Sequence, residues 1–159
     1  MSALGSLTRR LGHQQWFGAA MRLLVPADRL VGRLTKGRVV AFGLVPTLVL
    51  TSTGRRSGKP RSNPLVYVPD GDAYVVIGSN WGQKQQPSWT FNLMAHPDAE
   101  VDVKGRRIPV NAAQVTGEER ERLFRRLVEE WPAYRTYVER AGGREIRVFR
   151  LAPNGDRGT

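Results

Sequence analysis

From residue 46 onward, short apolar runs alternate with turn signals, and this pattern limits the chain to a small fold built on hairpins. The strand candidates cover residues 48–52, 64–68, 73–79, 99–103, 106–115 and 145–151. Pro69-Asp70-Gly71-Asp72 and Lys104-Gly105 carry the residue types that close hairpin turns. About six short strands with such links predict a mainly β (α+β) fold, a small antiparallel barrel with helices packed outside it.

Helices are predicted at two places within this strand pattern. Residues 89–95 should form a short helix with Ser88 as its N-cap and Pro97 marking its end. Thr116 and Glu119 have the spacing of a capping box, which predicts a helix running to about residue 131. A second short helix follows Pro132. The longer helix is expected to bury Leu123, Leu127 and Val128. A doubly wound nucleotide fold is disfavoured, because no G-x-G-x-x-G turn is present.

The first 24 residues have a different pattern. Apolar residues from Leu4 to Met21 recur at spacings close to one helical face, with arginines beside them, and Pro26 ends the pattern. This pattern predicts an amphipathic helix over residues 3–24, and two interpretations remain open. The helix packs on the protein's own core, or it lies on a membrane surface, where Trp16 and the arginines would be favourable. No signal peptide is visible, and the apolar run at 39–45 is far shorter than the about 20 residues that span a bilayer.

Three segments follow from these patterns. Residues 1–38 comprise the N-terminal helix and a basic connector, residues 39–153 the barrel domain, and residues 154–159 a polar tail. At 159 residues the chain is long enough to bury a core without metals or disulfides.

Charge and composition narrow the chemistry. The formal net charge is +11, and residues 1–68 hold eleven Lys or Arg against the single acidic Asp28, which predicts an acidic partner near that end: nucleic acid, anionic lipid or a polyanionic small molecule. The absence of cysteine fits a reducing cytoplasm and removes thiolate chemistry, while two histidines argue against a histidine metal site. Asp98, Glu100 and Asp102 share a strand face, which favours a solvated acidic surface over a metal site.

No set of catalytic side chains is recognisable, so a cofactor is expected to carry the chemistry if the protein is an enzyme. The turn Thr53-Gly54-Arg55-Arg56-Ser57-Gly58-Lys59-Pro60-Arg61 holds four cations and two glycines between two strand-like runs. Glycines permit close backbone approach, and guanidinium groups grip phosphate bidentately. The turn is therefore either an anion-binding site or a solvated basic loop.

Two further clusters could complete a cofactor pocket. The first is a polar loop at residues 79–84 that leads into the short helix, where Trp89 and Asn92 lie one turn apart. The simpler interpretation of this segment is a helix N-terminus with a tryptophan in the core. The second comprises Trp131, Tyr134 and Tyr137, which on a continuous helix would form a stripe. Such stripes usually belong to the core, although buried tyrosine hydroxyls need partners.

Several motifs together resemble a known family. The run T-G-R-R-S-G-K-P-R-S-N-P-L is followed by P-D-G-D-A-Y-V-V, P-S-W-T-F-N-L-M-A-H-P, W-P-A-Y-R-T-Y and R-E-I-R-V-F-R-L. In order and spacing, over about residues 44–153, they are similar to the deazaflavin-dependent nitroreductase family. The resemblance implies a split β-barrel and an oxidoreductase that uses reduced coenzyme F420, an 8-hydroxy-5-deazaflavin, to reduce quinones and in some members nitroaromatics. That coenzyme carries a phosphodiester and a polyglutamate tail, which agrees with the basic charge.

The resemblance also implies roles for individual residues. Those expected to hold the phosphate and acidic tail are Arg55, Arg56, Ser57, Gly58 and Arg61, with Trp89 and Asn92 completing that end of the groove. Those expected to border the deazaflavin ring are Pro64, Ile77 and Ser79. The acceptor pocket is assigned to Trp131, Tyr134 and Tyr137, and catalytic hydrogen bonding to Ser79, Tyr134 and Tyr137. No metal is expected.

Three positions depart from the family pattern. Trp131 stands where a Tyr is usual, and Asn80 and Trp81 replace a more typical Lys-Gly. An added indole narrows the pocket, which puts nitroimidazole-type activity in doubt.

Two other functions remain open from the residues alone. An FMN-binding split-barrel oxidoreductase would use the same arginines for its phosphate. A nucleic-acid-binding protein would agree with the charge, but no nucleic-acid motif occurs, so no nucleic-acid partner is expected. The expected location is the cytoplasm, with peripheral contact at the inner face of the cell membrane if residues 3–24 bind lipid.

Overall fold

The computed structural model describes residues 46–155. The predicted helix at residues 3–24, the boundary near residue 38 and most of the polar tail lie outside the described residues. No helix in the described range is long and apolar enough to cross a membrane.

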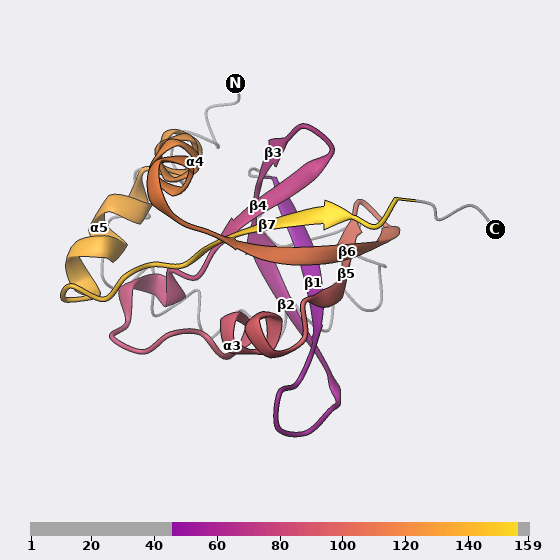
Figure 1. The fold of residues 1–159 in the computed structure, drawn as a ribbon. Coiled ribbons are helices and arrows are strands. Elements are labelled where there is room, and N and C mark those ends of the chain that lie inside the picture. Colours follow the sequence, from indigo (N-terminus) through magenta and orange to yellow (C-terminus); the bar gives the residue numbers. More distant parts are fainter. Residues whose placement is uncertain (1–45, 156–159) are drawn as a thin grey trace.

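The described chain is organised around one antiparallel sheet in the order β2-β1-β5-β6-β7-β4-β3. Its strands are β1 (Thr47–Thr53), β2 (Pro60–Val66), β3 (Val68–Asp70), β4 (Ala73–Ile77), β5 (Asp98–Val103), β6 (Arg106–Val115) and β7 (Val148–Pro153). Although β2 and β4 are separated by four strands in this order, they contact each other. The sheet is therefore curled into a half-barrel, as Figure 1 shows. The predicted split β-barrel with flanking helices is confirmed.

In the described range, three helices cover this sheet: α3 (Ser88–Ala95), α4 (Gly117–Glu130) and α5 (Ala133–Arg140), with a short 3-10 turn at Asn80–Gly82. In Figure 1, α4 and α5 lie together at the left end, and α3 lies apart from them, below the sheet. Leu123 and Leu127 are fully buried on the inner face of α4, beside Val128, as the spacing predicts.

The core has two parts because β4 is buried on both faces. Val75 and Ile77 belong to the cluster beneath α4 and α5, whereas Val76 between them joins the cluster that contains α3 and β1. Side chains alternate across a strand, so successive residues of β4 serve opposite faces. The strand that separates the two clusters thus links the helical end of the molecule to the α3 side.

Several predicted boundaries are wrong. The predicted strand at 64–68 is two elements, since β2 already begins at Pro60 and ends at Val66, and Val68 opens β3. The predicted last strand begins three residues later, at Val148, and β4 ends at Ile77, before Ser79. The hairpins at Gly71 and at Lys104-Gly105 form as predicted.

Both predicted helix caps differ from the structure. Ser88 is the first helical residue and not the N-cap; Pro87 occupies that position, and the Thr90 hydroxyl donates to its carbonyl oxygen at 2.8 Å. Thr116 stands at the N-cap of α4 but makes no capping hydrogen bond. Glu119 instead pairs with Arg150 on β7 at 2.6 Å, so a long-range cation replaces the capping box.

Asp70 is the centre of a charge cluster that joins the β3–β4 hairpin to α4 and β7. Its carboxylate accepts a hydrogen bond from Arg126 at 3.0 Å, pairs with Arg150 and lies 3.6 Å from Arg122. Burial alone would raise the pKa of Asp70, but the hydrogen bond and charge of Arg150, with Arg122 and Arg126, outweigh it and lower the pKa.

Candidate functional site

The basic turn between β1 and β2 is held by its own backbone. Gly54 N donates to Lys59 O at 2.8 Å, and Gly58 N donates to Gly54 O at 2.8 Å. The Ser57 hydroxyl oxygen accepts from Lys59 N at 3.2 Å. Gly58 has φ +65°, and a Cβ on Gly54 would lie 2.5 Å from Ser57 Oγ and 3.1 Å from Lys59 O, so a side chain at either position would strain the turn. The turn has a built shape that does not depend on a ligand.

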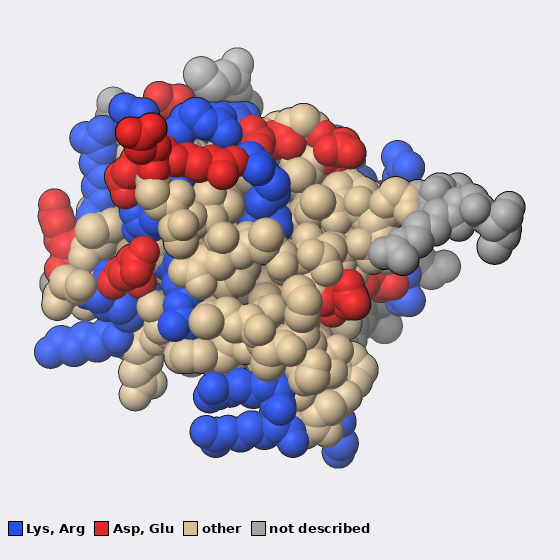
Figure 2. Space-filling model, viewed as in Figure 1, with Lys and Arg blue, Asp and Glu red and all other residues tan. Residues whose placement is uncertain are grey.

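The cations of this turn are exposed and have no acidic partner among residues 46–155. Arg55, Arg56, Lys59 and Arg61 are all exposed. Within residues 46–155 none of them forms an ion pair, although arginines on β6, α4 and β7 do. Figure 2 shows basic side chains projecting at the lower end of the molecule, where Figure 1 places the β1–β2 turn, with no acidic residue beside them on that face. Within the described part of the chain, the turn can therefore receive an anion without first breaking a salt bridge.

Asn92 fixes this turn to α3. Its side-chain oxygen accepts from Arg55 N at 3.0 Å, and its amide nitrogen donates to the Ser52 hydroxyl oxygen at 3.3 Å. Asn92 is 6% exposed; its bond to Ser52 is buried and its bond from Arg55 is part-buried. Trp89, one turn earlier, is buried in the core edge-on to Phe149 at 5.7 Å between ring centroids. The structure thus places Asn92 behind the turn and Trp89 in the core.

Two arginines stack on one aromatic ring beside the turn. The Arg55 guanidinium lies 4.5 Å from the Phe91 ring centroid, and that of Arg147 lies 4.7 Å from the same ring. Arg147 also donates to the Thr90 hydroxyl at 3.4 Å and has no acidic partner among the described residues. Cation–π contact fixes a guanidinium without neutralising it. Sequence reasoning missed both Phe91 and Arg147, since their contact joins α3 to the segment before β7.

The second part of the site is the turn after β4. Ser79 precedes the 3-10 turn, in which Asn80 and Trp81 have positive φ values of 46° and 56°. The Trp81 indole lies edge-on to Tyr137, with ring centroids 6.0 Å apart. A Cβ on Gly82 would lie 3.0 Å from Tyr137 Cα and O, so only glycine allows this approach. The turn therefore packs directly on α5.

The three aromatic residues predicted to line the acceptor pocket come together, but not as a stripe on one continuous helix. Trp131 ends α4, whereas Tyr134 and Tyr137 lie on α5, and all three belong to the same core cluster. They are buried, at 5%, 5% and 1% exposure. The ring centroids of Tyr134 and Tyr137 lie 5.9 Å apart, and the two ring planes are inclined by 71°.

The tyrosine hydroxyls are neutral donors. Burial raises the pKa of Tyr134 well above its ordinary value, and the neighbouring Tyr137 adds to the shift. Burial likewise raises the pKa of Tyr137, and a hydrogen bond from the Trp131 side chain and the charge of Arg140 oppose it only in part. The indole N–H of Trp131 can only donate, and within the described part of the chain the buried Tyr137 hydroxyl has no acceptor for its own proton. A neutral O–H whose proton has no acceptor is free to donate to a bound oxygen.

Pro64 and Ile77, predicted to border a ring, lie on the two strands that contact each other across the curl of the sheet. Pro64 is half-buried on β2, and Ile77 is buried at the end of β4. Ser79 follows two residues after Ile77 and is partly exposed. The curl thus brings the two predicted ring-facing strands together.

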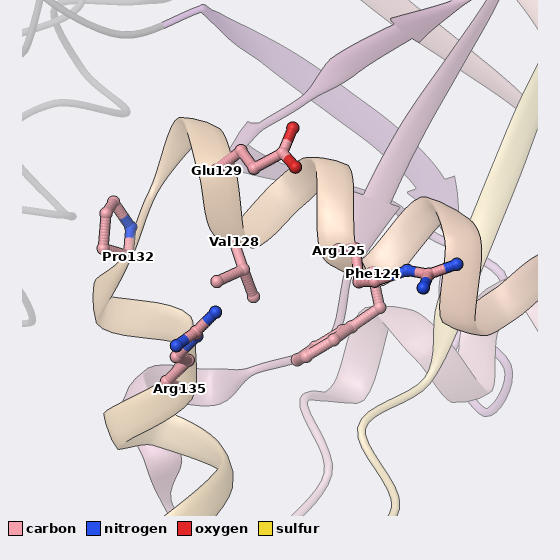
Figure 3. A pocket seen from close by; sticks show the side chains of 6 residues that line it. All are labelled: Phe124, Arg125, Val128, Glu129, Pro132 and Arg135. Carbon is pink, nitrogen blue, oxygen red and sulfur yellow. The ribbon is translucent and has the colours of Figure 1, made fainter.

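An open cleft of about 570 Å³ lies on α4 and α5. Figure 3 shows its lining, which comprises Phe124, Arg125, Val128, Glu129, Pro132 and Arg135. None of the residues predicted for the site lines it. We therefore do not assign the proposed chemistry to this cleft.

A metal site finds no support in the described residues, where no cluster of three His, Cys, Asp or Glu could hold an ion. The acidic side chains on β5 have separate local partners. Asp98 accepts from Asn111 at 3.0 Å, Glu100 lies 3.8 Å from Arg107, and Asp102 accepts from Gly105 N at 2.9 Å. This arrangement agrees with a solvated acidic surface.

Comparison with known proteins adds to this geometry. Residues 26–153 match the family described as F420H(2)-dependent quinone reductase. The chain is 41% identical over 73 residues to F420H(2)-dependent quinone reductase Rv1261c of Mycobacterium tuberculosis; the match covers 46% of this chain and 49% of that protein, so it spans about half the length of that curated relative.

Solved structures show the same relationship. A structure of F420-H2 dependent reductase FDR-A is 36% identical, with a TM-score of 0.62 over 67% of this chain and 93% of that chain. Another, described as a domain-swapped dimer, is 33% identical, with a TM-score of 0.65 over 79% of this chain and 93% of that chain.

Proposed function

Because the chain belongs to the F420H(2)-dependent quinone reductase family, we propose that it is an oxidoreductase that transfers a hydride from reduced coenzyme F420 to a quinone. The observation that carries this proposal, beyond family membership, is the exposed basic turn at residues 53–61, whose cations have no acidic partner in the described range. The coenzyme's phosphodiester and acidic tail are the anions that such a turn fits.

The coenzyme-binding end is the basic turn with its supports. Arg55, Arg56 and Arg61 supply guanidinium groups, and Gly58 keeps the backbone open to approach. Ser57 accepts a bond within the turn, so its contribution is to shape the loop as well as to contact an anion. Asn92 holds the turn in place from α3. Trp89 supports the same helix from the core.

The acceptor end is formed by the aromatic residues of the helical side. When bound, the reduced deazaflavin supplies the hydride. We assign to Tyr137 the hydrogen bond to an acceptor oxygen that becomes negative, because its buried hydroxyl is neutral and its proton has no described acceptor. Tyr134 and Ser79 are further donors at this end. Trp131 and Trp81 exclude water and limit the width of the acceptor.

Quinones are the acceptors that we expect the protein to favour over nitroaromatics. The Trp81 indole packs against Tyr137 at the proposed pocket and takes up space there. An acceptor panel with reduced F420 under anaerobic conditions tests this order of preference. Faster reduction of nitroaromatics than of every quinone would contradict the proposal.

Coenzyme binding is tested first. Titration of the protein with F420, followed by fluorescence, should give weaker binding for Arg55→Ala/Arg56→Ala, and the difference should shrink at high salt. Lys104→Ala/Arg106→Ala is the control, because it removes the same charge from the β5–β6 hairpin. Equal losses in the two variants would remove the turn from the site. Tight binding of FMN without binding of F420 would favour the alternative flavin-binding module.

Location is a separate proposal. We expect the protein to work in the cytoplasm and its residues 3–24 to bring it to the inner face of the membrane, where lipophilic quinones reside, since their sequence is amphipathic and basic. Sedimentation with anionic vesicles, compared with a chain that begins at Val39, tests this. Equal sedimentation of the two proteins would contradict it.

A further inference from the structure

The turn after β4 is an unusual piece of backbone. Asn80 and Trp81 have φ values of 46° and 56°, and Gly82 follows with φ 78°. Three consecutive residues are therefore left-handed, and two of them are not glycine. Side chains other than glycine rarely adopt this conformation, and it persists only where the surroundings hold it.

Arg144 supplies those surroundings from a segment more than fifty residues later in the chain. Its Nε donates to Gln83 O at 3.1 Å, and its Nη2 donates to Ser79 O at 2.9 Å. Its Nη1 donates to Gly78 O at 3.1 Å and to the Gln86 side-chain oxygen at 2.7 Å. All three nitrogens of the guanidinium thus bond to oxygens before and after the turn.

The neighbourhood of Arg144 favours this bridging role over an ion pair. None of its four bonds is to a carboxylate, and it forms no ion pair with the described residues. Gln86 is itself fixed, because its side-chain nitrogen donates to Glu145 O at 2.8 Å. A planar, five-donor fork can hold several carbonyl oxygens at once, which an ammonium group on a lysine cannot reproduce.

What the fork holds in place is Trp81. The indole meets Tyr137 edge-on at 6.0 Å, and Gly82 packs against the backbone of the same tyrosine. Any change in the path of the turn moves the indole relative to the buried hydroxyl of Tyr137, which lies at the acceptor end of the proposed site. The position of the Arg144 guanidinium therefore affects the width of the acceptor end of the proposed site.

We propose that Arg144 is a positioning residue that fixes Trp81 against Tyr137 and so sets the size of quinone that the protein accepts. The inference about quinone size rests on the proposed function, whereas the inference about Trp81 does not. Arg144 itself has no role in the chemistry: it acts through the turn that it holds.

The first experiment needs no coenzyme. The protein has four tryptophans, and labelling them with 5-fluorotryptophan gives a separate 19F NMR signal for each. Trp81→Gly assigns its own signal by loss. Arg144→Lys and Arg144→Gln should shift or broaden the Trp81 signal and leave those of Trp89 and Trp131 in place, which also verifies that the variants fold. An unmoved Trp81 signal in a folded variant would overturn the proposal.

The second experiment measures selectivity. The ratio of kcat/KM for a one-ring quinone to that for a two-ring quinone should fall by about fivefold in Arg144→Lys, while the KM for reduced F420 stays unchanged. Trp81→Gly should lower the same ratio. Because Arg144 acts through Trp81, adding Arg144→Lys to Trp81→Gly should change the ratio no further. Arg106→Lys, on the exposed start of β6, is the control and should keep the wild-type ratio.

The outcomes separate the two proposals. An unchanged ratio in Arg144→Lys, or additive effects in the double variant, would overturn the selectivity role even if the NMR signal moves. A wild-type protein that reduces neither quinone with reduced F420 would overturn the proposed function instead. In that case the NMR result still decides whether Arg144 positions Trp81.

Discussion

Replacing Asn92 with alanine tests how the basic turn is held. The amide joins α3 to the turn by two hydrogen bonds, from Arg55 N at 3.0 Å and to the Ser52 hydroxyl at 3.3 Å. Alanine removes both bonds and leaves Ser52, which is 1% exposed, without its amide partner. The perturbation therefore acts at the root of the turn and leaves its cations intact.

The magnitude follows from burial. A net hydrogen bond contributes about 0.5–1.5 kcal/mol, and a buried group left without a partner costs about 1–3 kcal/mol. The expected loss of unfolding free energy is thus about 3 kcal/mol, or roughly 6–12 °C in melting temperature for a chain of this size. Released from α3, the turn must also be ordered by the ligand, at about 0.5–1.5 kcal/mol for each arginine, so F420 affinity should fall by about tenfold.

Two measurements check this expectation: denaturant unfolding for stability and fluorescence titration for F420 affinity. Asn111→Ala is the matched control, because Asn111 is an exposed asparagine with one bond, to Asp98 at 3.0 Å. It should change stability by less than about 0.5 kcal/mol and leave affinity unaltered. The reasoning fails if the two variants lose equal stability, or if Asn92→Ala unfolds more easily but binds F420 as tightly as the wild type.

Three further changes probe other parts of the molecule. Tyr137→Phe should lower turnover while changing the free energy of unfolding by no more than about 1 kcal/mol, since the hydroxyl donates to no described acceptor and only the hydrogen bond from Trp131 is lost. Unfolding and steady-state rates measured together check this, and a much larger loss of stability would reveal a hidden acceptor. Gly82→Ala should destabilise by about 2 kcal/mol or more, because the new Cβ would lie 2.9–3.0 Å from α5 at φ +78°; a melting temperature equal to wild type would refute the contact. The pKa of Asp70 is lowered in the folded protein. Its contribution to stability should therefore be present above the ordinary Asp pKa of about 3.9 and disappear as pH falls through the folded-state value. The unfolding free energies of wild type and Asp70→Asn should become equal at that acidic pH, and a difference that does not change with pH would contradict the ion-pair cluster.

Much of the fold could be predicted because its signals are local. The Gly71 and Lys104-Gly105 turns depend on residues within the turn itself, and both hairpins form as expected. The apolar face of α4 likewise follows from spacing alone. The predicted capping box does not form, because Glu119 pairs instead with Arg150 on β7. That contact joins residues far apart in the sequence, so no local pattern predicts it.

The candidate site was predictable in its residue types but not in its supports. The cations of the basic turn are exposed as their composition predicts. Their attachment to Asn92, and the stacking of Arg147 on Phe91, depend on packing between distant segments. The sequence thus suggested the candidate ligand groups and Asn92, whereas Phe91, Arg147 and the contacts that hold the turn could not be predicted from local patterns.

The two outermost strands of the described sheet both contain proline. β3 is only three residues long and has Pro69 at its centre, while β2 carries Pro60 and Pro64. Proline has no N–H to offer, so a strand arriving from another molecule finds an interrupted ladder at either margin. The prolines thereby disfavour the growth of fibres by strand addition at the margins of the described sheet.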